Sequence, residues 1–138
     1  MGATFNMCRG GIPVDEMVQS FAPSRQAKIK TYFESMLGKF ELTGPYNDET
    51  AKLIRPVMGA VPLFSVGGWR DLGQMEDAVS NGNTDFISMC RPFIRQPDLV
   101  KRFREGKAEK ASCKNCNKCL AALPNDLQVR CYYKGFPK

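Results

Sequence analysis

The sequence of 138 residues contains no histidine. A mechanism that needs an imidazole as acid, base or metal ligand would have to obtain it from another chain. Serine–histidine–aspartate and cysteine–histidine nucleophile systems are therefore excluded within this polypeptide. The sequence also lacks any run close to the roughly 20 apolar residues of a membrane span. Its N-terminus lacks the basic and apolar regions of a secretory signal, so we expect a cytoplasmic protein without a membrane partner.

The composition is that of an ordinary globular domain. Hydrophobic residues make up 43% of the chain and charged residues 25%, which excludes a disordered tail or a small disulfide-rich protein. There are 20 basic and 14 acidic residues, and most of the excess positive charge follows Arg91. No aromatic residues alternate with these basic residues, and no recognised nucleic-acid-binding module accompanies them. We therefore expect a solvated surface and no nucleic-acid partner.

Short apolar runs alternate with helical patterns along the chain. The apolar runs predict strands at residues 3–8, 62–66 and 86–89. The helical patterns predict helices at 24–37, 50–57, 72–80 and 98–105, with Ser24 capping the first and Asn47 or Asp48 the second. The strands lack regular polar alternation, as expected when both faces are covered. The order of elements therefore predicts an α/β fold with parallel strands.

Two predicted strands end in residues suited to binding an anion. Gly67 and Gly68 follow the second strand and would let the backbone approach a ligand closely. Cys90 and Arg91 follow the third strand, and a guanidinium beside backbone N–H groups suits a phosphate. Neighbouring parallel strands would present both ends at one edge. The alternatives are a tight strand–helix turn at the glycines and a structural ion pair at Arg91.

Two side chains beside the glycines have open roles. Trp69 would either shield the edge of a bound ligand or pack at the rim. Arg70 would either add charge to the anion site or pair with Asp71 or Glu76. The sequence leaves these alternatives open.

Four segments of this chain resemble the C-terminal end of the Old Yellow Enzyme family. These are GGWR at 67–70, NTDFIS at 83–88, RPFIRQPDL at 91–99 and CKNCNKCL at 113–120. The likeness is densest from Val61 to Leu120, and RGGIPVDE at 9–16 resembles the sixth strand and its loop. Members of this family are FMN-dependent NAD(P)H oxidoreductases and ene-reductases built on a TIM barrel.

The resemblance implies a partial TIM barrel and an FMN phosphate site. Residues 1–106 would form the last three βα units of the barrel, and 107–138 a Cys-rich tail. Gly67 and Gly68 would hold the phosphate through backbone N–H groups, and Cys90 and Arg91 would complete the site. The family more often has glycine at the position of Cys90. Only a backbone N–H is needed there, so cysteine fits if its φ is negative.

A complete TIM barrel typically needs about 250 residues, so much of the barrel is absent from this chain. In the family, the histidine pair that binds the substrate carbonyl comes from earlier strands. We therefore expect the isolated chain to be inactive and to bind FMN weakly or not at all. A completed barrel would transfer hydride from NAD(P)H to an electron-poor alkene. Completion would come from a second copy or from an N-terminal barrel half; the alternative is a non-catalytic half-barrel that self-associates.

The tail carries a cluster of cysteines. The clustered residues are Cys113, Cys116, Cys119 and Cys131, spaced C-x2-C-x2-C-x11-C. Thiols at such spacing can converge on one soft metal ion, which allows zinc and a small Cys–metal interaction module. Dienoyl-CoA-reductase relatives in the family hold a [4Fe–4S] cluster through a similar set whose second gap is three residues. Free thiols or a disulfide are the alternative. We expect Cys8 and Cys90 to be buried in strands.

Overall fold

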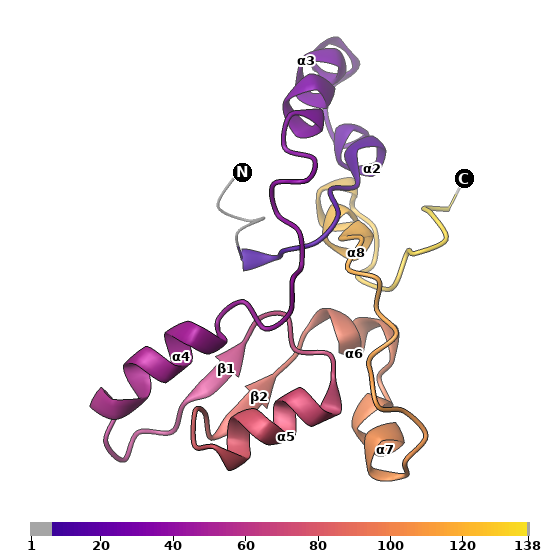
Figure 1. Ribbon diagram of the computed structural model, residues 1–138. Helices are drawn as coiled ribbons and strands as arrows, with labels where there is room; N and C mark the ends of the chain where they lie inside the picture. Colours follow the sequence, from indigo (N-terminus) through magenta and orange to yellow (C-terminus); the bar gives the residue numbers. More distant parts are fainter. Residues whose placement is uncertain (1–6, 138) are drawn as a thin grey trace. The chain divides into compact units, whose positions relative to one another are not determined.

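The computed structural model describes residues 7–137 and divides the chain into two compact units (Figure 1). Leu42–Cys113 form the first, which we call the central unit. The second, the terminal unit, combines Met1–Glu41 with Lys114–Lys138. The four residues predicted to bind phosphate all belong to the central unit, so the site can be described within it.

A parallel pair of strands forms the sheet of the central unit. The strand β1 (Phe64–Val66) pairs with β2 (Phe86–Ser88), and Val66 lies opposite Ser88. The helix α5 (Leu72–Ser80) connects them, as Figure 1 shows. The backbone amide of Phe86 donates to the Leu63 carbonyl at 3.1 Å, which sets the register where the pair begins. The prediction of an α/β fold with parallel strands is confirmed for these two strands.

The helices of the central unit follow the predicted pattern with small shifts. The helix α4 (Asp48–Ile54) begins two residues before the predicted start and continues into a 3₁₀ turn, η1 (Arg55–Val57), because Pro56 cannot donate a helical hydrogen bond. The helix α5 has the predicted bounds, since the Asp71 carboxylate accepts from the Gln74 amide and caps it. The helix α7 (Leu99–Arg104) lies inside the range 98–105, whereas α6 (Arg91–Arg95) has no counterpart among the predicted helices.

Trp69 stands at the centre of the core of this unit. Its side chain is 3% exposed and packs with Met75 and Ala78 of α5. The indole N–H donates to Ser65 Oγ at 3.1 Å, which ties the residue after the glycines back to β1. The indole therefore packs inside the central unit, against α5.

The terminal unit is helical in its described part. It contains α2 (Val14–Val18), α3 (Pro23–Glu34), α8 (Lys118–Ala121) and a 3₁₀ turn, η2 (Leu123–Asn125). Its core comprises Ile12, Val18, Phe33 and Met36. The Asn117 side chain is 1% exposed and donates to the carbonyls of Cys8 and Gly11 at 2.8 and 2.9 Å. These bonds join two segments that are more than 100 residues apart in the sequence.

Three predictions for the N-terminal part need correction or lie outside the description. The helix α3 begins at Pro23 and ends at Glu34, and no side chain caps it, so the prediction that Ser24 caps a helix over 24–37 was wrong. Proline suits the first helical position because it lacks the N–H that would be unpaired there. Most of the predicted strand at 3–8 lies outside the described residues. Cys8 itself lies in a bend and is partly exposed, so it is not buried in a strand.

Across residues 7–137, no helix combines the length and the apolar character that crossing a membrane requires.

Candidate functional site

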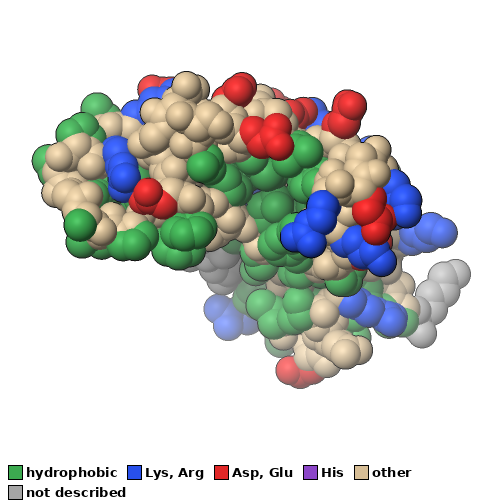
Figure 2. Space-filling model, turned by 90° about the horizontal axis from the view of Figure 1, so that it is seen from below, with side chains coloured by type: hydrophobic (Ala, Val, Ile, Leu, Met, Phe, Trp, Pro, Cys, Tyr) green, Lys and Arg blue, Asp and Glu red, His purple; other side chains and the backbone are tan. Residues whose placement is uncertain are grey.

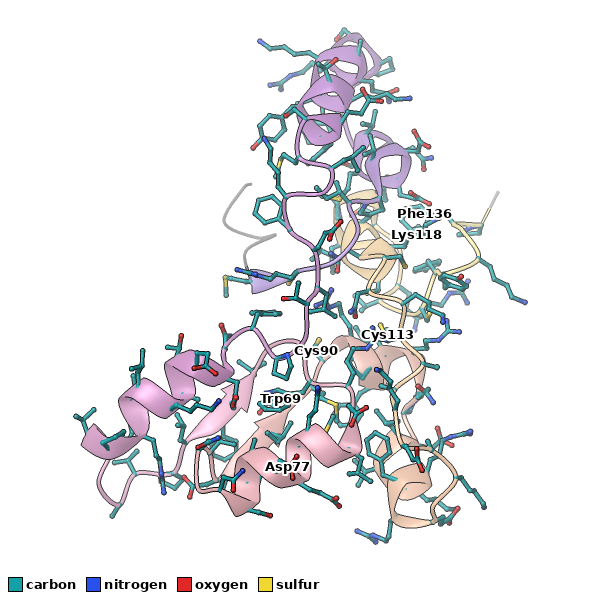
Figure 3. All side chains as sticks on the ribbon, in the orientation of Figure 1. Trp69, Asp77, Cys90, Cys113, Lys118 and Phe136 are labelled. Carbon is teal, nitrogen blue, oxygen red and sulfur yellow. The ribbon has the colours of Figure 1, made fainter. Side chains whose placement is uncertain are left out.

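The two predicted phosphate loops leave the sheet at the same edge. Val66 pairs with Ser88, and both strands run in the same direction. Gly67 and Gly68 therefore leave β1 beside the end of β2. Cys90, which is labelled in Figure 3, follows this end of β2. The register thus brings together two segments that lie about 20 residues apart in the chain.

The conformation of both glycines is one that other residues rarely adopt. Gly67 has φ +120° and Gly68 has φ +84°. A Cβ on Gly67 would lie 2.7 Å from a ring carbon of Tyr46, and one on Gly68 would overlap the Gly44 carbonyl oxygen. The Asn47 side chain donates to the Val66 carbonyl at 2.6 Å and holds the segment in place. Glycine at both positions is therefore demanded by packing, in addition to any role with a ligand.

Cys90 lies exposed just before α6. It precedes the first helical residue, Arg91, with φ −114°. A negative φ places no strain on a side chain, so cysteine fits where the family more often has glycine. The prediction that Cys90 is buried in a strand was wrong, because β2 ends at Ser88 and the chain then turns into α6.

Arg70 has an unusual environment close to these loops. One Nη donates to the Ala111 carbonyl at 3.3 Å, whereas the buried Nε has no hydrogen-bond partner in the part of the chain that the structure describes. Burial lowers the pKa of the Arg70 guanidinium, and the nearby positive charge of Arg91 lowers it further, although Cys113 opposes this effect. Two guanidinium groups are thus held near one another.

The open alternative that Arg70 pairs with Asp71 or Glu76 finds no support within residues 7–137. Asp71 caps α5, and its carboxylate lies 3.9 Å from Lys110. No ion pair joins Arg70 to either carboxylate in this range. Arg70 therefore keeps a buried Nε–H donor without an acceptor among the described residues.

A short strap formed by residues 109–112 lies against the start of α5 and the end of α6. The Ala111 amide donates to the Arg70 carbonyl at 2.8 Å, and the Leu72 amide donates to the Glu109 carbonyl at 2.8 Å. At the other end, the Ser112 amide donates to the Gln96 side chain at 2.6 Å. The strap thus ties the start of α5 to the end of α6. These bonds join segments far apart in the sequence, so no local residue pattern indicated them.

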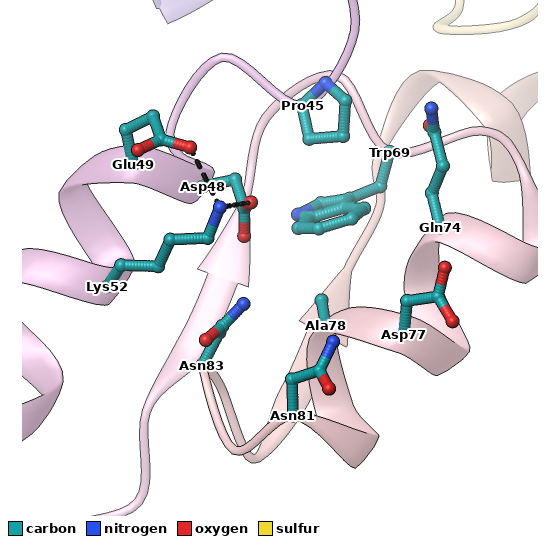
Figure 4. A pocket seen from close by; sticks show the side chains of 10 residues that line it. All are labelled: Pro45, Asp48, Glu49, Lys52, Trp69, Gln74, Asp77, Ala78, Asn81 and Asn83. Atoms are coloured by element: carbon teal, nitrogen blue, oxygen red, sulfur yellow. Dashed lines mark hydrogen bonds and ion pairs between the residues drawn. The ribbon is translucent and has the colours of Figure 1, made fainter.

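A pocket of about 380 Å³ lies elsewhere in the central unit, between α4 and α5 (Figure 4). Trp69 and Pro45 line one side, and Asn81 and Asn83 lie opposite. Lys52 bonds the Glu49 and Asp48 carboxylates at 2.8 and 2.9 Å, and these contacts raise the pKa of its ammonium group. None of the four predicted phosphate-binding residues lines this pocket, so it is not the predicted site.

The tail cysteines do not form a metal centre in the described residues. Over 7–137, no group of three or more Cys, Asp or Glu side chains is placed to hold a metal ion. Cys113 is buried, Cys116 and Cys119 are partly exposed, and Cys131 is exposed. The prediction of zinc or an iron–sulfur cluster therefore has no support. The structure forms no disulfide among the six cysteines either.

Named relatives of this chain are flavin enzymes and reductases. The chain is 29% identical over 120 residues to a 4,4'-dithiodibutanoate disulfide reductase of Rhodococcus erythropolis, a match that covers 83% of the chain and 28% of the relative. An NADH-dependent flavin oxidoreductase of Talaromyces variabilis is 45% identical over 51 residues, covering 37% and 12%. A cinnamate reductase of Clostridium sporogenes is 29% identical over 89 residues, covering 63% and 13%. The chain thus spans less than a third of the length of each.

The family itself is shown by a match over most of the chain. No solved structure gives a significant match. The model of the NADH:flavin oxidoreductase / NADH oxidase family matches residues 14–110, a range that includes β1, β2 and both loops described above. Given that match, and the relatives that agree with it, this chain belongs to the NADH:flavin oxidoreductase / NADH oxidase family.

Proposed function

We propose that this chain is the C-terminal portion of an FMN-dependent NAD(P)H oxidoreductase and supplies the loops that bind the FMN phosphate. The observation that carries the proposal is the parallel register of Val66 with Ser88. It brings the segment Gly67–Gly68 and the segment Cys90–Arg91 to one edge of the sheet. In α/β barrels, the loops after the last two strands frequently form a phosphate site.

The residues present fit a phosphate group. Backbone amides from a glycine turn and an arginine side chain are suited to the oxygens of a phosphate dianion. Arg70 adds a buried Nε–H without a partner in the described residues, which is a donor that a phosphate oxygen would satisfy. When bound, FMN supplies the hydride-transfer chemistry through its flavin ring. The part of this chain would be to hold the phosphate and so anchor the cofactor.

The reaction proposed for the completed enzyme is reduction of an electron-poor alkene by NAD(P)H. The cinnamate reductase among the relatives supports this class by its name. The disulfide reductase relative has a disulfide substrate in its name, so the acceptor within the family varies. Because the chain has no histidine, a histidine pair that binds the acceptor carbonyl would have to come from outside it.

An exposed face of the sheet supports the proposal that a partner completes the barrel. The side chains of Phe64, Val66 and Phe86 are 58, 53 and 51% exposed. The two phenylalanine rings stack with centroids 4.5 Å apart. Figure 2 shows apolar side chains at the surface between charged ones. We propose that this face is covered by an N-terminal barrel half or by a second copy; a non-catalytic half-barrel that self-associates is the second candidate, and the same face favours it.

The test is a calorimetric titration of the 138-residue chain with FMN and with riboflavin, which lacks the phosphate. We expect FMN to bind weakly, with a dissociation constant above the micromolar range, and inorganic phosphate to compete with it. Riboflavin should not bind. Arg91→Gln should weaken FMN binding about tenfold, since it removes a charge-assisted hydrogen bond. The matched control Arg104→Gln removes the same charge from the exposed end of α7 and should leave binding unchanged. Of the two outcomes expected for the isolated chain, weak binding or none, the proposal requires weak binding. Equal binding of riboflavin and FMN, or no FMN binding at millimolar concentration, would therefore contradict it.

A further inference from the structure

Arg70 is a charged side chain that the predicted phosphate site did not include. It lies two residues after Gly68, at the turn from β1 into α5. Its guanidinium has five N–H donors. One bond, to the Ala111 carbonyl, is present, and the buried Nε has no partner in the described residues. A buried donor without an acceptor destabilises the fold, and a charged one does so more strongly, so its persistence calls for a partner.

The charges around Arg70 point to an anionic partner. Arg91 lies near enough for its positive charge to disfavour the charged form of Arg70. Within residues 7–137, no carboxylate forms an ion pair with Arg70, because Asp71 instead caps α5 and faces Lys110. The other neighbouring titratable group is the buried thiol of Cys113. The positive charges of Arg70 and Arg91 repel each other, and no carboxylate pairs with Arg70 in this range. An anion that binds between the two guanidinium groups would relieve this repulsion.

The backbone holds Arg70 in place for such a role. The Arg70 carbonyl accepts from the Ala111 amide at 2.8 Å, while its own Nη donates back to the Ala111 carbonyl. The following residue, Asp71, forms an antiparallel bridge with Lys110. The side chain is therefore anchored at one Nη, while its buried Nε has no acceptor among the described residues. A preorganised guanidinium loses less entropy when it binds a phosphate.

We propose that Arg70 is a second arginine ligand of the phosphate site and donates its Nε–H to a phosphomonoester held by the loops after β1 and β2. This inference rests on the proposed function and extends it, because it adds a residue from the start of α5 to a site predicted from the two strand ends. The ligand chemistry is a phosphate dianion, which FMN or free inorganic phosphate can supply.

The experiment measures binding of FMN and of inorganic phosphate to the 138-residue chain and to Arg70→Gln, Arg70→Lys and the control Arg104→Gln. We expect Arg70→Gln to weaken binding of both ligands about tenfold. Arg70→Lys should recover only part of this loss, since an ammonium group cannot reproduce the Nε geometry. Arg104→Gln should bind like the unmodified chain. Equal loss for FMN and phosphate assigns the effect to the phosphate; a loss for FMN alone would overturn the proposed contact.

A second measurement needs no variant, in case Arg70→Gln does not fold. In the NMR spectrum of the unmodified chain, the Nε–Hε resonance of Arg70 should shift as inorganic phosphate is added, and riboflavin should leave it unchanged. A resonance that stays fixed while the amides of Gly68 and Cys90 shift would overturn the role of Arg70 and leave the proposed function standing. If the unmodified chain binds neither FMN nor phosphate, the proposed function fails, and the role of Arg70 fails with it.

Discussion

Gly68 shows how one residue can serve the fold and the proposed site together. Its φ of +84° and the carbonyl of Gly44 leave no room for a side chain. The same absence of a Cβ exposes the backbone amide to a ligand that approaches from the other side. A substitution here would therefore affect stability as well as binding, and the two effects must be measured separately.

Gly68→Ala should lower the free energy of unfolding by about 2–4 kcal/mol, because it combines an unfavourable φ with an overlap at Gly44. Urea denaturation followed by the fluorescence of Trp69, the single tryptophan, measures this change in the central unit. The matched control is Gly82→Ala, since Gly82 has φ +70° but nothing within 4 Å of the position of a Cβ. It should cost only about 1 kcal/mol. Equal losses in the two variants would show that the contact with Gly44 is unimportant.

Lys118 and Glu16 give the terminal unit a dependence on pH. Lys118 Nζ lies 2.5 Å from a Glu16 oxygen, and this hydrogen bond raises the pKa of the ammonium group above its usual 10.5. A raised pKa in the folded state stabilises the protein below about pH 10.5, and the contribution disappears as the pH rises through the folded-state pKa. Comparison with Glu16→Gln isolates this contribution.

We therefore expect the unmodified chain to be more stable than Glu16→Gln at pH 8, with the difference shrinking above about pH 10.5. Urea denaturation followed by circular dichroism at a series of pH values measures the difference. A gap between the two proteins that stays constant from pH 8 to the alkaline limit would contradict the assignment to Lys118.

At the scale of elements, the start of β2 is held by a side chain that binds three donors. Asp85 accepts from two guanidinium nitrogens of Arg55 at 2.7 and 3.1 Å and from the Leu63 amide at 2.7 Å. Arg55 begins η1, so the pair joins the end of the α4 segment to the point where both strands begin. The register that aligns the strand ends depends on this junction.

Asp85→Asn should destabilise the central unit by about 1–2 kcal/mol, because the amide keeps the shape but loses the charge that strengthens these bonds. Glu49→Gln removes a charge from a side chain that is 84% exposed and should change stability by less than about 0.5 kcal/mol. Thermal unfolding monitored at Trp69 distinguishes the two. If Asp85→Asn proves as mild as Glu49→Gln, the carboxylate does not hold the junction.

The sequence predicted elements well where local signals were strong. The helix α5 was predictable because Asp71 precedes a regular helical pattern and Gly82 follows it. The two strands were predictable because short apolar runs end at Gly67 and near Cys90. The start of α4 was less clear, since the Asn47 side chain bonds the Val66 carbonyl and does not cap the helix. Whether Asn47 caps the helix depends on its contact with Val66, a residue 19 positions away in the sequence, which no local pattern reveals.

The candidate site could be predicted in part. The strand ends carried residues that matched a family, so Gly67, Gly68, Cys90 and Arg91 could be named from the sequence. The role of Arg70 could not be decided, because a choice between an anion and the carboxylates of Asp71 or Glu76 depends on side-chain direction. The cysteine spacing allowed a metal site, with free thiols or a disulfide as the alternative. The described residues do not support the metal site, because spacing alone does not fix how thiols converge.

At the scale of the whole molecule, the chain belongs to a family whose named relatives are several times longer. Its sheet presents Phe64, Val66 and Phe86 on an exposed face. Three neighbouring exposed apolar side chains favour association with another protein surface, because covering them removes apolar area from water. Our proposal accounts for the face as a surface that another part of a barrel covers.

The double variant Phe64→Thr, Phe86→Thr should therefore reduce self-association of the 138-residue chain. Threonine has a high strand propensity, so both strands should still form. The loss of the aromatic pair should lower the free energy of unfolding by about 1 kcal/mol. Sedimentation at several concentrations measures association. Leu53→Thr, at a side chain that is 78% exposed on α4, is the matched control and should associate like the unmodified chain. A chain that stays monomeric at high concentration, with or without these changes, would contradict association through this face.

The most direct test of the central claim is an amide-resolved NMR titration of the 138-residue chain with FMN, repeated with riboflavin. The account predicts that FMN shifts the amide resonances of Gly67, Gly68, Cys90 and Arg91 together, along one binding curve, and that riboflavin leaves them unchanged. Shifts confined to one of the two loops, or shifts centred on the pocket between α4 and α5, would contradict a phosphate site built from both strand ends.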